Sequence, residues 1–343
     1  MKKLLNTLFV TTQDAYLARE GEQILVRVEG DTKLRLPIHT IGGIVCFGRV
    51  SCSPFALQLC ADNDVAVSFL TETGRYLARL QSHTSGNVLL RREQFRRADS
   101  PEASAVVAQA VVIGKVCNCR TVLRRAARDH AEAVNADALD AACRELDLSV
   151  TRLGMPLPLD ALRGCEGDAA HAYFAVFDHL ITAQKDDFRF AERSRRPPLD
   201  NVNALLSFVY TLLTHDVAAA LQVVGLDPQV GFLHRDRPGR PSLALDLMEE
   251  LRPVLADRLV LSLINRRQVT AKGFRTTASG AVLMDDDTRR SVLVAHQERK
   301  RDSIRHPFLD EETEVGLLPY IQALLLARFL RGDLDGYPPF IWK

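Results

Sequence analysis

The chain has 343 residues, of which 47% are hydrophobic and 25% are charged. This composition is ordinary for a globular protein and leaves room for two domains, and it excludes a disordered, collagen-like or small disulfide-stapled chain. The 44 Lys and Arg residues are balanced by 43 Asp and Glu residues, which gives a formal net charge of +1. Net charge therefore indicates neither a nucleic acid nor a membrane surface as a partner.

The cysteines and the apolar stretches predict a cytoplasmic protein. The seven cysteines include no CxxC pair, which disfavours a disulfide framework or a structural zinc site. The first 18 residues contain two lysines and a short apolar run but no cleavage site, so we interpret them as a first strand rather than a signal peptide. Residues 204–224 are interrupted by Thr214, His215 and Asp216, and no membrane span is expected.

Residues 1–88 carry the pattern of short strands. Alternating runs at residues 23–28 and 33–36 are separated by turn residues such as Gly21 and Gly30. Several short strands in fewer than 90 residues predict a small β-sandwich or β-roll domain.

The rest of the chain carries helical periodicity. Apolar stripes with helical spacing lie at residues 103–130, 160–185, 201–224, 242–264 and 316–330. We therefore predict the α+β class, with the small N-terminal β domain followed by a larger all-α domain over residues 101–343. The polar residues 89–100 are predicted to be a linker.

Basic residues gather in runs within the helical part. A solvated helix face explains a single run, whereas several runs in one domain favour a phosphate-binding surface. One run also contains Lys115. The candidate DNA-binding residues are Arg120, Arg124, Arg125, Arg128, Arg235, Arg237, Arg240, Arg266, Arg267, Lys272 and Arg275.

The segment at residues 231–253 is the most informative for chemistry. His234 precedes a turn rich in Pro, Gly and Arg, and Ser242 is predicted to cap a helix that contains Asp246, Glu249 and Glu250. One imidazole with neighbouring carboxylates suits Mg²⁺ or Mn²⁺. The alternative is an ordinary surface histidine with acidic residues that favour the helix dipole.

A second acidic position lies in Arg163-Gly-Cys-Glu166-Gly-Asp168. The glycines indicate a loop followed by a helix, with Glu166 at the start of the helical stretch. On the residues alone, Glu166 is a capping or dipole-compensating acid.

Three segments in chain order resemble the CRISPR-associated protein one family: Arg163-Gly-Cys-Glu166-Gly, Gly231-Phe-Leu-His234 and Ser242-Leu-Ala-Leu-Asp246-Leu-Met-Glu249. Residues 201–213 are similar to the family segment that precedes the histidine. The resemblance implies that Glu166, His234 and Glu249 are ligands of Mg²⁺ or Mn²⁺, and that Asp246 lies beside the metal as a further catalytic residue. Whether one or two ions bind, and whether His234 also acts as a general acid, stays open.

The resemblance further implies a DNA endonuclease and integrase of antiviral defence. Such an enzyme inserts a protospacer duplex into a CRISPR repeat when a 3′-hydroxyl attacks a phosphodiester. The implied partners are DNA, a second copy of the chain bound through the N-terminal β domain, and a small companion adaptation protein that bridges two dimers. The alternatives are a stand-alone metallonuclease acting on branched DNA and a non-catalytic DNA-binding scaffold.

The last eight residues, 336–343, contain aromatic residues where a polar end would be usual. We expect this segment to pack back on the helical domain rather than to dock onto a partner. It also resembles the subtype I-C branch of the family.

Overall fold

The computed structural model describes residues 7–72, 76–80, 88–130 and 132–343. The chain divides into two compact units. The first contains Met1–Gly86 and Gln297–Asp302, and the second contains Asn87–His296 and Ser303–Lys343. The sequence prediction of a β domain followed by a mostly helical domain is confirmed.

Among the residues that the structure describes, the first unit contains two four-stranded sheets. One has the order β1-β5-β7-β8, and the other has the order β4-β3-β2-β6. The strands are β1 (Thr7–Val10), β2 (Tyr16–Glu20), β3 (Gln23–Val28), β4 (Asp31–Pro37), β5 (Gly43–Phe47), β6 (Ser51–Cys52), β7 (Ala66–Leu70) and β8 (Tyr76–Arg79), with helix α1 (Pro54–Asp62) between β6 and β7. The chain passes between the sheets several times, so both sheets contribute to one core.

The antiparallel hairpins lie where the sequence predicts them. β2, β3 and β4 form a meander, and the turn between β3 and β4 places Glu29 and Gly30 at φ values of 54° and 87°. A two-residue hairpin turn of this kind needs two consecutive positive φ values, which glycine adopts without strain. The other sheet differs from a set of hairpins, because β1 pairs with β5 and β5 with β7 in parallel.

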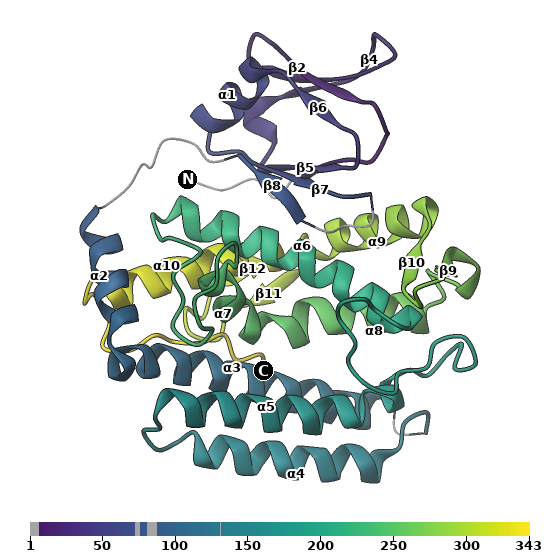
Figure 1. Cartoon of the computed structure of the whole chain (residues 1–343). Helices are drawn as coiled ribbons and strands as arrows, with labels where there is room; N and C mark the ends of the chain where they lie inside the picture. Colours follow the sequence, from purple (N-terminus) through teal and green to yellow (C-terminus); the bar gives the residue numbers. More distant parts are fainter. Residues whose placement is uncertain (1–6, 73–75, 81–87, 131) are drawn as a thin grey trace. The chain divides into compact units, whose positions relative to one another are not determined.

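The second unit is mostly helical (Figure 1). Its helices are α2 (Val88–Asp99), α3 (Pro101–Asp129), α4 (Ala136–Arg152), α5 (Leu159–Ala175), α6 (Asn201–Val223), α7 (Ser242–Leu251), α8 (Arg258–Asn265), α9 (Asp286–Arg299) and α10 (Leu318–Leu330), the last residues of α9 lying in the first unit. A π-helical turn, Arg252–Asp257, joins α7 to α8. The prediction of an all-α domain needs one correction, since two short hairpins are present: β9 (Phe274–Thr276) with β10 (Val282–Met284), and β11 (Ser303–Arg305) with β12 (Glu312–Glu314).

Helix α3 is the central element of this unit. Ser100 caps its first turn by accepting a hydrogen bond from the Ala103 amide, and Pro101 occupies the first helical position. α4, α5 and α7 all pack against α3, and α3, α4 and α5 run side by side in Figure 1. Because so many neighbours surround α3, apolar side chains cover most of its circumference.

The predicted linker at residues 89–100 is folded into the helical unit. All of it except Ser100 lies in α2, whose Gln94 side chain is fully buried. The Gln94 amide donates hydrogen bonds to the carbonyls of Asp227 and Val230 and accepts one from the Asp227 amide. Most polar residues of this segment lie on the exposed or half-buried face of α2, whereas Gln94 is buried and fixes the backbone at residues 227–230.

In the part of the chain that the structure describes, two helices, α3 and α6, are long and apolar enough to cross a membrane by length and composition alone. Core helices of globular proteins pass the same test, so it leaves the prediction of no membrane span untested. In the structure, 67% and 61% of their apolar windows are buried inside the protein. Burial of this extent is typical of core helices in a globular domain.

Candidate active site

Two of the three predicted metal ligands, Glu166 and Glu249, contact one buried ammonium. Lys115 on α3 forms ion pairs with Glu166 of α5 and with Glu249 of α7, and its Nζ lies 2.7 Å from Glu249 Oε2. The side chains of Lys115 and Glu249 are 7% and 2% exposed, while Glu166 retains 29% exposure. Three helices far apart in sequence thus bring two carboxylates to a single cation.

Burial alone would raise the pKa of Glu249, but Arg252 and Lys115 outweigh it and lower that pKa to about 2. Arg252 contributes through an ion pair in which its Nη1 lies 2.8 Å from Glu249 Oε1. Burial likewise tends to lower the pKa of Lys115, but Glu249 and then Glu166 raise it above the ordinary value. Glu249 is therefore a carboxylate and Lys115 an ammonium at neutral pH.

His234 approaches Glu249 from the loop before α7. Its Nε2 lies 4.0 Å from Glu249 Oε1, and its Nδ1 lies 2.6 Å from Asp246 Oδ1. A carboxylate can only accept in this contact, so the proton of a neutral imidazole is on Nδ1. The lone pair of Nε2 is then directed to the side of the ring where Glu249 lies.

Asp246 holds the loop that carries His234. Its Oδ2 accepts hydrogen bonds from the backbone amides of Phe232 and Leu233, and its Oδ1 accepts one from the amide of His234. The side chain is 1% exposed, and these four contacts use both of its oxygens. In this arrangement Asp246 orients the histidine and the loop.

Two further residues explain the motifs around this loop. Arg163 of α5 donates a hydrogen bond to the Leu233 carbonyl at 2.7 Å, which ties the helix carrying Glu166 to the loop carrying His234. At Gly231 an added Cβ would lie 2.8 Å from Asp246 Oδ2 and 2.8 Å from the backbone of Ser242. A larger residue at position 231 would therefore displace the aspartate that orients His234.

Two local predictions at the site are wrong. Glu166 lies in the middle of α5, because the helix continues through Gly164 and Gly167 instead of starting beside them. Ser242 is the first residue of α7 rather than its cap, and its hydroxyl donates to the Arg235 carbonyl at 3.4 Å. Pro241 occupies the capping position without a side-chain hydrogen bond.

Glu250 points away from this cluster. Its carboxylate accepts hydrogen bonds from the Tyr337 hydroxyl, the Gln322 amide and the Phe340 amide, and it is completely buried. Asn118 of α3 donates to the Phe340 carbonyl and accepts from the Trp342 amide. The expectation that residues 336–343 pack back on the helical unit is thus confirmed.

The candidate DNA-binding residues fall into three environments. Arg120 and Arg124 pair with Asp147 of α4, Arg125 packs on the Trp342 ring, and Arg128 pairs with its neighbour Asp129. Arg235 pairs with Asp160 beside the site, while Arg237 and Arg240 lie on the same loop. Arg266, Arg267, Lys272 and Arg275 are exposed at the end of α8 and around β9.

Sequence reasoning missed Lys115 and Arg252 as parts of the site. Lys115 was grouped with the basic run that follows it, although its helical register places it on a buried face. Arg252 lies three residues after Glu249, a spacing that brings the two side chains together on a helix. That spacing was visible in the sequence and could have identified Arg252.

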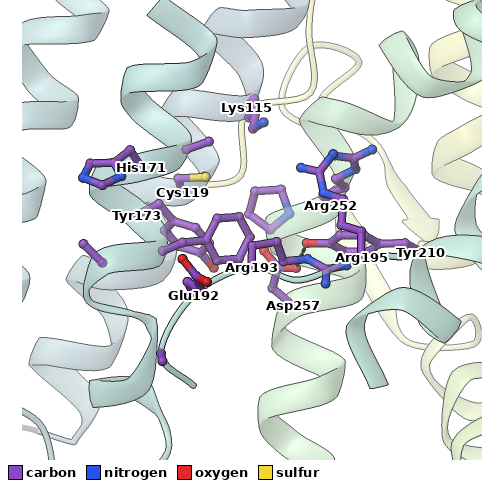
Figure 2. A pocket seen from close by; sticks show the side chains of 15 residues that line it. Lys115, Cys119, His171, Tyr173, Glu192, Arg193, Arg195, Tyr210, Arg252 and Asp257 are labelled. Atoms are coloured by element: carbon purple, nitrogen blue, oxygen red, sulfur yellow. Dashed lines mark hydrogen bonds between the residues drawn. The ribbon is translucent and has the colours of Figure 1, made fainter. Parts of the chain in front are cut away.

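A pocket of about 310 Å³ lies beside Lys115 and Arg252, the two cations that pair with Glu249. Lys115 and Arg252 belong to its wall, together with Arg193, Arg195 and Tyr210. Figure 2 shows Arg193 and Arg252 beside the Tyr210 ring, and the Arg252 guanidinium carbon lies 4.9 Å from the ring centroid. The pocket wall thus combines these cationic side chains with the carboxyl groups of Glu192 and Asp257, and burial raises the pKa of Asp257 to about 6.

Comparison with known proteins identifies the family. The family model of CRISPR associated protein Cas1 matches residues 8–298. A protein of Chlorobaculum tepidum named CRISPR-associated endonuclease Cas1 1 is 55% identical over the full length of both chains. A protein of Rhodospirillum rubrum named CRISPR-associated endonuclease Cas1 2 is 52% identical, again with full coverage of both.

Solved structures share the fold at lower identity. A CAS1 protein from Thermotoga maritima has a TM-score of 0.80 at 23% identity, and the match covers 95% of this chain and 97% of that one. A casposase bound to its integration product has a TM-score of 0.84 at 21% identity, covering 98% and 94%. On the family model and the two full-length relatives, the chain belongs to the CRISPR-associated protein Cas1 family.

Proposed function

We propose that the protein is a metal-dependent DNA endonuclease and integrase of CRISPR adaptation. The observation that carries this proposal is the pairing of Glu166 and Glu249 with one buried ammonium, while Nε2 of His234 lies 4.0 Å from Glu249 Oε1. Relatives that match along the full length are named endonucleases of the same family. The shared family supports the endonuclease activity, and the chemistry of the site supports its metal dependence.

The donor atoms suit a divalent ion. Two carboxylates and an imidazole nitrogen are ligands that Mg²⁺ and Mn²⁺ accept. Within the described ranges, no three His, Cys, Asp or Glu side chains are already gathered at metal-ligand geometry, and the Lys115 ammonium lies between Glu166 and Glu249. The carboxylates therefore bind a cation, and a bound Mg²⁺ or Mn²⁺ would supply charge stabilisation at a phosphoryl oxygen.

In the proposed transfer, the 3′-oxygen of an incoming strand forms a bond to a phosphorus atom of the repeat. The bond from that phosphorus to its leaving oxygen breaks, the attacking hydroxyl loses its proton, and the leaving oxygen gains one. Asp246 keeps the lone pair of His234 Nε2 available, and Arg252 keeps Glu249 ionised. The pocket cations would hold the phosphodiester in line for attack.

DNA is the proposed partner, in the form of a protospacer duplex and a CRISPR repeat. The exposed residues Arg266, Arg267, Lys272 and Arg275 are the better candidates for phosphate contacts, because Arg120 and Arg124 already pair with Asp147. Paired arginines have less free charge to offer a phosphate.

The other partners are proposed on the family resemblance. They are a second copy of the chain bound through the first unit and a small adaptation protein that bridges two dimers. The subtype I-C assignment rests on the resemblance of residues 336–343 alone. A cytoplasmic location suits the seven cysteines, all of which are free thiols.

Glu166→Gln, His234→Ala and Glu249→Gln test the proposal in a strand-transfer assay with a repeat-containing plasmid and Mn²⁺. Each variant is expected to lose joined product while keeping the wild-type circular dichroism spectrum. Glu145→Gln, an exposed position on α4, is the matched control and should retain activity. Cleavage without joining would favour a stand-alone metallonuclease, and wild-type DNA binding with no chelator-sensitive activity would favour a scaffold.

A further inference from the structure

Lys115 faces two environments. Toward α5 and α7 its ammonium contacts Glu166 and Glu249, and on its other side it belongs to the wall of the pocket that also contains Arg193 and Arg195. Its side chain is 7% exposed, and burial of an ammonium is costly unless anions compensate it. The two carboxylates supply that compensation.

A divalent ion bound by Glu166 and Glu249 would lie close to the Lys115 ammonium, which already contacts Glu166 Oε1 and Glu249 Oε2, and would compete with it for these carboxylates. Two cations that need the same oxygens exclude each other or share them at an electrostatic cost. The ammonium of a lysine can move away from the carboxylates, because it ends a flexible four-carbon side chain. Arg252 is placed differently, since its ion pair involves the other Glu249 oxygen, Oε1.

We propose that Lys115 is a displaceable cation of the active site, which competes with the divalent ion for Glu166 and Glu249 and turns to the DNA phosphate when the ion is bound. The proposal rests on the proposed function, because it requires a metal site at these carboxylates. It adds a residue that links metal binding to DNA binding. The ammonium has an anionic partner in both positions.

This competition predicts that loss of Lys115 raises Mn²⁺ affinity and lowers strand transfer. Lys115→Met removes the competitor and leaves Glu166 and Glu249 with less positive charge nearby. We expect the Mn²⁺ affinity of the DNA-free protein to rise by about tenfold or more, within the range of about 10–100-fold that residues around metal ligands control. We expect strand transfer to fall, because the phosphate loses a cation.

The experiment titrates Mn²⁺ alone into the full-length protein and measures affinity by calorimetry, with wild type, Glu249→Gln and Lys115→Met side by side. Arg144→Met, at an exposed position on α4, makes the same change of net charge away from the site and should bind Mn²⁺ as wild type does. Lys115→Gln provides a neutral replacement of similar polarity if the methionine variant does not fold. Mn²⁺ should also raise the melting temperature more in the lysine variants than in wild type.

A second measurement tests the turn toward DNA. Mn²⁺ should increase the affinity of wild type for a short DNA duplex, and Lys115→Met should reduce that increase. Unchanged or weaker Mn²⁺ binding in both lysine variants would overturn the proposal while the metal site itself stands. If instead Glu249→Gln binds Mn²⁺ as wild type does, the proposed metal site fails and the role of Lys115 fails with it.

Discussion

Asp246→Asn removes one of the two acceptor oxygens on which the His234 loop depends. In the protein, Oδ2 accepts the amides of Phe232 and Leu233, while Oδ1 accepts the His234 amide and the Nδ1 proton. An asparagine oxygen can keep the first pair of contacts. Its NH₂ group then faces the His234 amide, so two donors meet and that hydrogen bond is lost.

The substitution also changes the histidine. The asparagine NH₂ can donate only to an unprotonated Nδ1, which moves the imidazole proton to Nε2. A protonated Nε2 has no lone pair for a metal ion. Hydrogen bonds to charged groups contribute about 1.5–3 kcal/mol each, so loss of one bond and weakening of another should lower the free energy of unfolding by about 3 kcal/mol. Metal affinity should fall by about 10–100-fold.

Urea unfolding measures the first effect, and Mn²⁺ calorimetry measures the second. Long-range ¹H–¹⁵N spectra of histidine-labelled protein report which ring nitrogen of His234 carries the proton. Asp140→Asn, an exposed position on α4, is the control for loss of one carboxylate. The reasoning is refuted if Asp246→Asn unfolds like wild type, binds Mn²⁺ equally well and keeps the proton on Nδ1.

Three other predictions concern stability, and they involve two helical glycines and Glu250. Gly114→Ala should lower the free energy of unfolding by about 1–3 kcal/mol, since its Cβ would lie 2.9 Å from Glu250 Cβ and 3.0 Å from Pro339 Cβ. A Cβ at Gly164 of α5 would meet nothing within 4 Å, so Gly164→Ala should stabilise the protein by up to about 1 kcal/mol. Equal changes in the free energy of unfolding for Gly114→Ala and Gly164→Ala, measured in urea, would contradict both predictions. Burial raises the pKa of Glu250 to about 7, from 4.5 in the unfolded chain. The folded state therefore favours the uncharged carboxyl group, and the stability that this group contributes is lost as the pH rises from about 4.5 through 7. Unfolding at pH 5 and pH 8 should show this loss in wild type and a smaller one in Glu250→Gln, and identical pH dependence of the two proteins would exclude Glu250 as the cause.

The fold class was predictable because the apolar residues of each unit recur with one period, that of strands in the first unit and that of helices in the second. Alternation at residues 23–28 and 33–36 gave β3 and β4, and the long apolar stripes gave α3 and α6. The parallel pairing of β1, β5 and β7 was not predictable, because it joins strands that are separated by a whole meander or by a helix. Pairing between distant strands leaves little trace in local sequence.

The candidate site was predictable only in part. Family motifs pointed to Glu166, His234 and Glu249, and helical spacing placed Asp246 near Glu249. Lys115 was not predicted as part of the site because basic runs usually indicate a solvated face, whereas α3 is enclosed by neighbouring helices. Which charges pair across helices depends on how the helices pack, and the order of residues alone does not specify that packing.

The short segment Gln297–Asp302 has a practical consequence, since it belongs to the first unit although it lies far along the chain. Within it, Lys300 donates a hydrogen bond to the Thr7 hydroxyl at 3.4 Å. A fragment cut after residue 86 would lack this contact and the rest of the segment. Dissection of the protein into independently studied halves would therefore require supplying residues 297–302 in trans or grafting them through a designed loop.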